Sequence, residues 1–264
     1  MSNPALQAFD LTPEIKEIAA RCAVQFNVSP ELAPTDHLLG FLINMLGEEK
    51  AITEYFSGGF RDAQQVMRLV ERCEATRPVR SVLEFASGYG RVTRHLTAAI
   101  GKRKLIASDI HLEACDFIRS TFGCETRHSS SEPVNLRLDD GFDLVFVLSL
   151  FSHLPPKSFG GWLSALSRKV GKDGFLMFTT HGEASMESAA PPINGKLDRA
   201  TGYLYQTYSD QKDIPGTSYG TMVVAADWVH RATVKEATGF RLESFKSREW
   251  WNLQDEWILR KFPQ

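Results

Sequence analysis

Residues 82–91, VLEFASGYGR, decide the fold of this chain. A short apolar run ends at Phe85, a turn with Gly88 and Gly90 follows, and the next residues have helical spacing. Glycines at such a turn permit backbone conformations that other residues avoid, and they let the backbone approach a ligand closely. The stretch predicts a strand, a ligand-binding turn and the start of a helix, whose free N–H groups can bind an anion.

The alternation of strand and helix continues toward the C-terminus. Strands are predicted at residues 79–85, 104–108, 124–127, 142–148 and 174–180, and helices at 91–100, 112–122, 157–170 and 227–237. Strands that alternate with helices of this length form a mostly parallel sheet covered on both faces. Two late strands, at 241–245 and 256–261, are close enough in sequence to pair antiparallel. The predicted fold class is α/β with an antiparallel final hairpin.

The residues before the first strand are predicted to be helical. Apolar residues at helical spacing indicate helices at 13–25, 36–46, 48–56 and 61–74, with Ser57-Gly58-Gly59 as a break. We expect residues 1–78 to form a helical cap and residues 79–264 to form the core domain. Within the core, residues 183–225 are rich in proline, glycine and tyrosine. A loop of this length is usually functional, so we expect it to be a lid over the substrate.

Composition and charge argue against several classes of protein. The chain has 264 residues, and its 30 Lys plus Arg against 32 Asp plus Glu give a net charge of −2, unlike a nucleic-acid binder. No apolar run approaches the ~18–20 residues that cross a membrane, and no signal peptide is expected. The four cysteines are scattered, which is typical of free thiols in a reducing compartment. We expect a cytoplasmic monomer or homodimer with no membrane or nucleic-acid partner.

Glu84 distinguishes between two classes of ligand for the turn. A dinucleotide site needs the pattern G-x-G-x-x-G, but Thr93 stands where the third glycine belongs. A carboxylate does not favour a pyrophosphate. It suits a cationic ligand such as S-adenosyl-L-methionine, which carries an ammonium and a sulfonium. The alternative is that Glu84 is an ordinary acid at the end of a strand.

These residues resemble the first motif of the class I S-adenosylmethionine-dependent methyltransferases, E/D-x-G-x-G-x-G. Here the pattern is Glu84, Ala86, Gly88 and Gly90, with alanine in place of the first glycine. Residues 141–154, GFDLVFVLSLFSHL, and 170–176, VGKDGFL, resemble the family's fourth strand and its turn into the fifth. The resemblance covers residues 79–182 and extends more loosely to the C-terminus, where the chain looks like a bacterial subgroup associated with glycan or secondary-metabolite assembly.

The resemblance implies a Rossmann-like fold with a mostly parallel seven-stranded sheet, and S-adenosyl-L-methionine as the cofactor. It implies that Asp109 binds the ribose hydroxyls and that Ile110 contacts the adenine. Arg61, in the segment YFSGGFR, would reach the cofactor carboxylate. Ser129 or Ser130 would take the place of an acid after the third strand, with a polar surface loop as an equal alternative. The other cofactor-binding residues that the resemblance implies, beyond the first motif, are Ser87, Leu148, Ser149 and His153.

The resemblance also directs attention to the acceptor. Methyl transfer to an oxygen needs a base, and histidine is the natural one near pH 7. His153 and His181 follow predicted strands, so both are catalytic candidates, although His153 can equally serve to order its loop. The acceptor is expected to be a small molecule, a sugar or natural-product hydroxyl or amine, and no metal is expected. Aromatic residues that would stack on it, unless they are plain packing residues, are Tyr203, Tyr205, Tyr219 and Trp250.

Two other functions remain open from the residues alone. One is an NAD(P)-dependent Rossmann oxidoreductase or epimerase. It predicts a third glycine after Gly90, which the sequence lacks, and a Tyr-x-x-x-Lys pair, whose spacing occurs once, at Tyr208 and Lys212 in the proline- and glycine-rich segment. The other is a non-catalytic module that keeps the fold and binds a partner. Against it, Glu84, the glycines and Asp109 are all intact.

Overall fold

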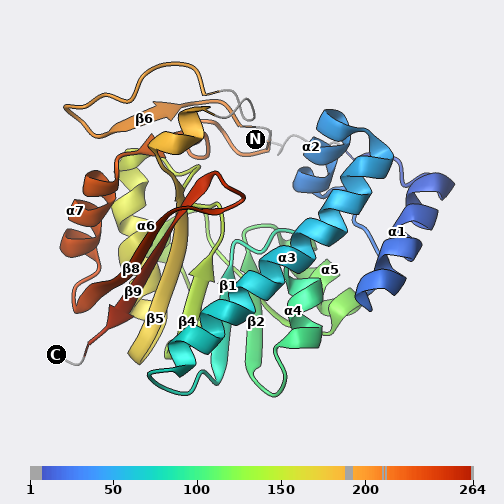
Figure 1. Cartoon of the computed structure of the whole chain (residues 1–264), viewed down its shortest axis with the longest axis horizontal. Helices are drawn as coiled ribbons and strands as arrows, with labels where there is room; N and C mark the ends of the chain where they lie inside the picture. Colours follow the sequence, from blue (N-terminus) through green and yellow to red (C-terminus); the bar gives the residue numbers. More distant parts are fainter. Residues whose placement is uncertain (1–7, 188–192, 210, 212, 263–264) are drawn as a thin grey trace. The chain divides into compact units, whose positions relative to one another are not determined.

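The computed structural model describes residues 8–187, 193–209, 211 and 213–262 (Figure 1). The chain divides into two compact units, one up to Ser129 (unit 1) and one from Ser130 onward (unit 2). Both combine helices with β-strands, and the α/β class predicted from the sequence is confirmed. Among the described residues, no helix is both long enough and apolar enough to cross a membrane.

Unit 1 begins with three helices, α1 (Pro13–Phe26), α2 (His37–Leu46) and α3 (Glu48–Glu74). Side chains that accept backbone N–H groups begin the first two, as the Thr12 hydroxyl does for α1 and the Asp36 carboxylate for α2. The inner faces of the three helices share one apolar core that includes Ile15, Leu39 and Phe56.

Helix α3 differs from its prediction. It runs without interruption for 27 residues, so the expected break at Ser57-Gly58-Gly59 is wrong. The glycines serve packing instead. A Cβ on Gly59 would lie 2.4 Å from the backbone oxygen of Arg91, so only glycine lets α3 approach the backbone there this closely.

The sheet of unit 1 has three parallel strands in the order β3-β2-β1: β1 (Ser81–Phe85), β2 (Lys104–Asp109) and β3 (Glu125–His128). Helices α4 (Thr93–Ala99) and α5 (Leu112–Phe122) connect them. Parallel strands have their carboxyl ends at the same edge of a sheet. The end of β1, with Glu84, and the end of β2, with Asp109, therefore share one edge of unit 1.

Unit 2 contains the remaining strands and two long helices. A short 3-10 helix η1 (Pro133–Asn135) precedes β4 (Phe142–Val147), which pairs parallel with β5 (Val170–His181). The C-terminal hairpin of β8 (Phe240–Trp250) and β9 (Gln254–Lys261) pairs antiparallel, and β9 continues antiparallel along β5. This confirms the predicted final hairpin. Helices α6 (Pro156–Lys169) and α7 (Ala226–Glu236) lie side by side (Figure 1), with Gly160 of α6 against Glu236 of α7.

The segment predicted as a lid, residues 183–225, has secondary structure of its own. It holds a 3-10 helix η2 (Glu183–Glu187) and two antiparallel strands, β6 (Tyr203–Gln206) and β7 (Thr221–Val224). Its residues 188–192, 210 and 212 lie outside the described part of the chain. Strand β7 joins the end of β5 through Val223, which pairs with His181. All seven predicted strands are present, and the described residues add two that the sequence patterns missed, β6 and β7.

Candidate functional site

Glu84 is a buried carboxylate near the carboxyl end of β1. It is 4% exposed and accepts a hydrogen bond from the Thr93 hydroxyl at 2.7 Å. Among the described residues it has no ion-pair partner. Burial raises the pKa of Glu84 to about 8, although the Thr93 hydrogen bond and the charge of Arg91 act to lower it. Burial therefore favours the protonated, neutral form of this carboxyl group in the ligand-free protein at neutral pH.

The turn after β1 is held in a left-handed backbone conformation. Ala86, Gly88 and Gly90 have φ angles of 60°, 55° and 78°, a region that favours glycine. A Cβ on Gly90 would lie 2.8 Å from the ring of Phe122, whereas a Cβ on Gly88 would meet no described atom within 4 Å. Gly90 is therefore required for packing, and Gly88 borders open space where a ligand can come close. Ser87 joins this turn to β2 through its N–H, which donates to the Ser108 oxygen.

Asp109 links the ends of the strands of unit 1. Its Oδ2 accepts the N–H of Gly88 at 2.8 Å, which ties it to the glycine turn. Its Oδ1 accepts the N–H of His111 at 3.0 Å and lies 3.0 Å from Nδ1 of the same histidine. The N–H of Ser129 donates to the Asp109 backbone oxygen, and the carbonyl of Ile110 lies 2.8 Å from Nε2 of His128. The structure thus brings together the predicted residues Glu84, Ser87, Gly88, Asp109, Ile110 and Ser129.

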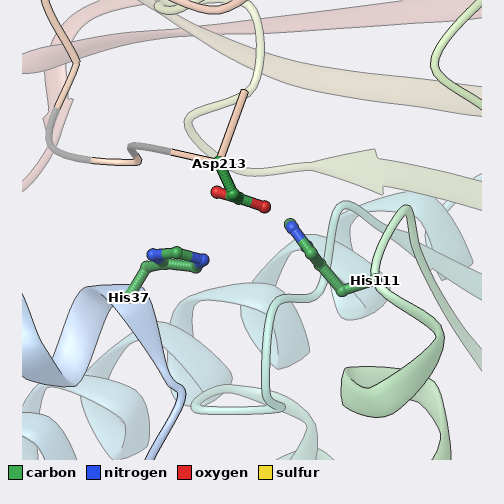
Figure 2. Close-up of side chains that lie close together, drawn as sticks. All are labelled: His37, His111 and Asp213. Carbon is green, nitrogen blue, oxygen red and sulfur yellow. The ribbon is translucent and has the colours of Figure 1, made fainter. Parts of the chain in front are cut away.

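Two histidines of unit 1 face each other beside Asp109. The rings of His37, at the start of α2, and His111 have centroids 5.6 Å apart (Figure 2). The third residue labelled in that view, Asp213, is part of unit 2. The His37–His111 contact therefore packs the first residue of α2 against the residue that precedes α5.

Arg61 and Arg91 occupy different environments. Arg61 is largely exposed on α3 and pairs with Glu54, so no contact among the described residues links it to the glycine turn. Arg91 is mostly buried, pairs with the buried Asp62, and is the arginine whose charge acts on Glu84. Sequence reasoning missed Arg91, although its place directly after Gly90 marks it as the first residue beyond the turn.

The loop after β4, in unit 2, carries further predicted residues. Leu148 and Ser149 are half-buried, and Ser149 has a left-handed backbone with φ 63°. Its N–H donates to the Thr179 hydroxyl of β5 at 2.8 Å.

Ser130 also belongs to unit 2, where its hydroxyl accepts the N–H of Glu132 just before η1. Ser130 therefore takes part in a local turn before η1, and no contact among the described residues tests its predicted cofactor role.

His153 is joined to the lid segment. Its Nδ1 lies 2.7 Å from the carbonyl oxygen of Gly220, and its own backbone oxygen accepts the N–H of Gly220 at 2.9 Å. Its ring stacks on Tyr219, with centroids 4.6 Å apart and planes inclined by 15°. Because a carbonyl only accepts, Nδ1 must donate. In the neutral ring the lone-pair nitrogen is therefore Nε2, the nitrogen that can take up a proton.

His181 is the more buried of the two candidate bases. Burial, reinforced by the charge of His153, lowers the pKa of His181 to about 3. Its Nε2 lies 3.1 Å from the side-chain nitrogen of Gln254. The sequence patterns did not single out Gln254, because β9 begins with three polar residues, Gln254, Asp255 and Glu256, and nothing local distinguishes the amide from its neighbours.

The four aromatic candidates for acceptor binding have different surroundings. Tyr203 and Tyr205 are half-buried on β6, and the Tyr205 hydroxyl donates to the carbonyl of Gly216 at 2.6 Å. Tyr219 stacks on His153 as described. Trp250 is fully buried, and its indole N–H donates to the buried Glu256 at 3.1 Å. Trp250 therefore packs inside unit 2, and its placement gives no support to an acceptor contact.

Comparisons with known proteins agree with this geometry. Residues 82–174 match the family model of the methyltransferase domain. The chain is 28% identical over 157 residues to a malonyl-[acyl-carrier protein] O-methyltransferase of Calditerrivibrio nitroreducens. That match covers 58% of this chain and 57% of that protein, so the chain spans little more than half the length of its curated relative.

Solved structures show the same fold at low identity. One is the glycopeptide N-methyltransferase MtfA in complex with S-adenosyl-L-methionine, with a TM-score of 0.53, 16% identity, and coverage of 78% of this chain and 87% of that one. Another is an S-adenosylmethionine-dependent methyltransferase from Clostridium acetobutylicum, with a TM-score of 0.53, 15% identity, and coverage of 85% and 98%. These likenesses confirm the Rossmann-like fold class.

Proposed function

We propose, from the match of residues 82–174 to the family model of the methyltransferase domain, that this protein is a class I S-adenosylmethionine-dependent methyltransferase. We further propose that its acceptor is a small molecule. The methyl group comes from S-adenosyl-L-methionine, and the acceptor is a hydroxyl or amine of a sugar or natural product. The observation that carries the proposal is the buried Glu84, tied through the glycine turn to Asp109.

The residues of unit 1 fit this cofactor. Glu84 is enclosed and has no ion-pair partner among the described residues. Burial disfavours its ionised form, and a bound ammonium group would stabilise that form as an ion pair. Gly88 borders open space, which gives room for a ligand against the backbone. Asp109 uses one lone pair on Oδ2 for Gly88, and a carboxylate has further lone pairs for ribose hydroxyls. Ile110 and Ser129 remain our candidates for the adenine.

When bound, the cofactor supplies a sulfonium-activated methyl group and a neutral thioether leaving group. The chain's own task is to position the acceptor and to manage its proton. In this proposal Nε2 of His153 takes up the proton of a hydroxyl acceptor, because Nδ1 donates its own proton to the carbonyl of Gly220. His181, with its pKa near 3, is too weak a base for this step at neutral pH. An amine acceptor, if already neutral, needs His153 less.

The acceptor side is proposed to lie in the lid segment around Tyr205 and Tyr219. Tyr219 is stacked on His153, so a ring or sugar held by this part of the lid would be presented to the same histidine. The near-neutral charge of the whole chain, −2, favours a small acceptor over nucleic acid. The solved neighbour that acts on a glycopeptide, MtfA, is consistent with a natural-product acceptor. A cytoplasmic location and a monomeric or homodimeric state stay predictions.

A methyl-transfer assay tests the proposal. The protein is incubated with S-adenosyl-L-methionine that carries a radiolabelled methyl group and with a panel of sugars and natural products that bear hydroxyl or amine groups. We expect label in at least one acceptor, and we expect Glu84→Gln to raise the KM for the cofactor. Glu14→Gln, at an exposed position of α1, is the matched control and should leave the KM unchanged. An absence of labelled product, together with an absence of cofactor binding, would leave the non-catalytic module as the better explanation.

A further inference from the structure

Gln254 is a buried amide at the start of β9. It is 2% exposed and lies opposite His181 in the antiparallel pairing of β5 with β9. A buried polar group without hydrogen-bond partners destabilises the fold. The partners of this amide therefore determine which way it points.

The hydrogen bonds of Thr179 identify the oxygen end of the amide. The N–H of Ser149 donates to the Thr179 hydroxyl oxygen at 2.8 Å, so the hydroxyl's own proton is available for another acceptor. That acceptor is Oε1 of Gln254, at 2.6 Å, a distance typical of an O–H···O bond and too short for an N–H···O bond from the amide nitrogen. The amide nitrogen consequently points the other way, toward His181 and the loop after β4.

The amide nitrogen has two protons and three acceptors within reach. It lies 3.1 Å from Nε2 of His181, 2.9 Å from Oγ of Ser149 and 3.3 Å from Oγ of Ser152. One proton goes to the imidazole, and the two serine hydroxyls share the other. Because Nε2 of His181 accepts, it carries no proton, and the neutral ring must hold its proton on Nδ1. That nitrogen is buried without a hydrogen-bond partner among the described residues, so the contact with Gln254 is what selects this tautomer.

Protonation of His181 on Nε2 would set that N–H against the N–H of Gln254. The interior also disfavours the charged ring, and the titratable group that acts on it, His153, adds to the effect. The pKa of His181, near 3, agrees with a ring that stays neutral at physiological pH.

The same amide holds the loop that carries His153. A left-handed backbone is unfavourable for a non-glycine residue, and Ser149 is kept there by its bonds to Thr179 and Gln254. The Ser152 hydroxyl donates to the Ser149 carbonyl at 2.5 Å, which closes the turn just before His153. The orientation of the loop after β4 thus depends on a residue about one hundred positions later in the chain.

We propose that Gln254 is a positioning residue, whose amide holds His181 as the neutral Nδ1–H tautomer and fixes the loop that carries His153. The proposal rests on the proposed function in so far as His153 acts there as the base. The tautomer of His181 is a property of the chain alone and can be measured without an acceptor.

Long-range ¹⁵N–¹H NMR of the full chain, labelled in its histidine rings, tests this. The signals of His181 are assigned by their loss in His181→Asn. In the wild-type protein we expect His181 to carry its proton on Nδ1 and to stay neutral from about pH 5 to pH 9. In Gln254→Glu a carboxylate oxygen faces Nε2, so His181 should gain a proton there and titrate within that range. The control Gln64→Glu adds the same charge at an exposed position of α3 and should leave His181 unchanged.

Thr179→Val provides a second test that does not depend on the folding of Gln254→Glu. It keeps the side-chain shape but removes the hydroxyl that orients the amide, so a population of His181 with its proton on Nε2 should appear. A wild-type His181 protonated on Nε2 would overturn the proposal, as would variants that retain the wild-type tautomer and titration. Binding of S-adenosylhomocysteine to the wild-type protein tests the proposed function separately, because its absence would not alter the His181 tautomer.

Discussion

Replacing Glu84 with glutamine should stabilise the ligand-free protein, and the gain should grow with pH. In the unfolded chain this carboxyl ionises near pH 4.5, whereas in the fold burial keeps its proton until about pH 8. Between these values the folded state binds more protons than the unfolded state, so the free energy of unfolding falls as the pH rises. Glutamine cannot ionise, and its oxygen can still accept the hydrogen bond from Thr93. The free energy of unfolding of the variant therefore does not fall with pH through this residue.

The size of the effect follows from the two pKa values. Each tenfold change in proton affinity corresponds to about 1.36 kcal/mol. The rise of the Glu84 pKa from 4.5 to about 8 therefore costs roughly 5 kcal/mol once the carboxyl is ionised in both states, and about 3 kcal/mol at pH 7. At pH 5 the carboxyl is only partly protonated in the unfolded chain and still protonated in the fold, so ionisation lowers the free energy of unfolding by less than about 1 kcal/mol.

Urea unfolding of the wild-type protein, Glu84→Gln and Glu14→Gln at pH 5, 7 and 9 measures this difference. We expect Glu84→Gln to be the most stable of the three at pH 9 and nearly equal to the wild type at pH 5. Glu14→Gln should follow the wild type throughout. A Glu84→Gln protein that is less stable than the wild type at pH 9, or a difference that does not change with pH, would refute the reasoning.

Three further predictions concern packing, binding and chemistry. Gly59→Ala should lower the free energy of unfolding by about 1–3 kcal/mol, because its Cβ would meet the Arg91 backbone oxygen at 2.4 Å; an unchanged urea midpoint would contradict this. Gly88→Ala should cost only roughly 1–2 kcal/mol of stability, because its Cβ enters open space, yet it should weaken S-adenosylhomocysteine binding measured by calorimetry. If Gly88→Ala bound S-adenosylhomocysteine with the wild-type affinity, the ligand would not occupy the space beside Gly88. His153→Asn should slow methylation of a hydroxyl acceptor by about 10²–10⁴-fold with unchanged cofactor affinity, and wild-type turnover would remove His153 as the base.

The strand–turn–helix unit around Glu84 was predictable because its signals are local. An apolar run, a glycine turn and an acid at the end of the strand lie within ten residues, and the structure gives each of them the expected backbone. Asp109 was predictable for the same reason, since it ends the next apolar strand. The bond from Gly88 to Asp109 then follows from two parallel strands that end at one edge.

Features that depend on tertiary packing were not predictable. Ser57, Gly58 and Gly59 have weak helix propensity, and the close packing of Gly59 against the Arg91 backbone explains why α3 continues through them. Strands β6 and β7 lie among prolines and glycines. They are strands because they pair with each other and because β7 also pairs with the end of β5. Burial of Trp250 against Glu256 likewise depends on the final hairpin.

The candidate site shows the same division. Sequence patterns found the acids, the glycines and both histidines. They could not distinguish the roles of His153 and His181, which depend on Gly220 for one ring and Gln254 for the other. Both partners are distant in sequence from the histidines that they contact, so no local pattern connects them.

Calorimetric titration of the wild-type protein with S-adenosylhomocysteine and, separately, with NAD decides between the two classes of ligand for the glycine turn. We expect saturable binding of S-adenosylhomocysteine and none of NAD. We also expect Glu84→Gln to weaken the binding of S-adenosylhomocysteine by about 10- to 100-fold above pH 8, where a charge-assisted hydrogen bond worth roughly 1.5–3 kcal/mol is lost. No binding of S-adenosylhomocysteine at saturating concentration, or binding of NAD in its place, would contradict the proposed function.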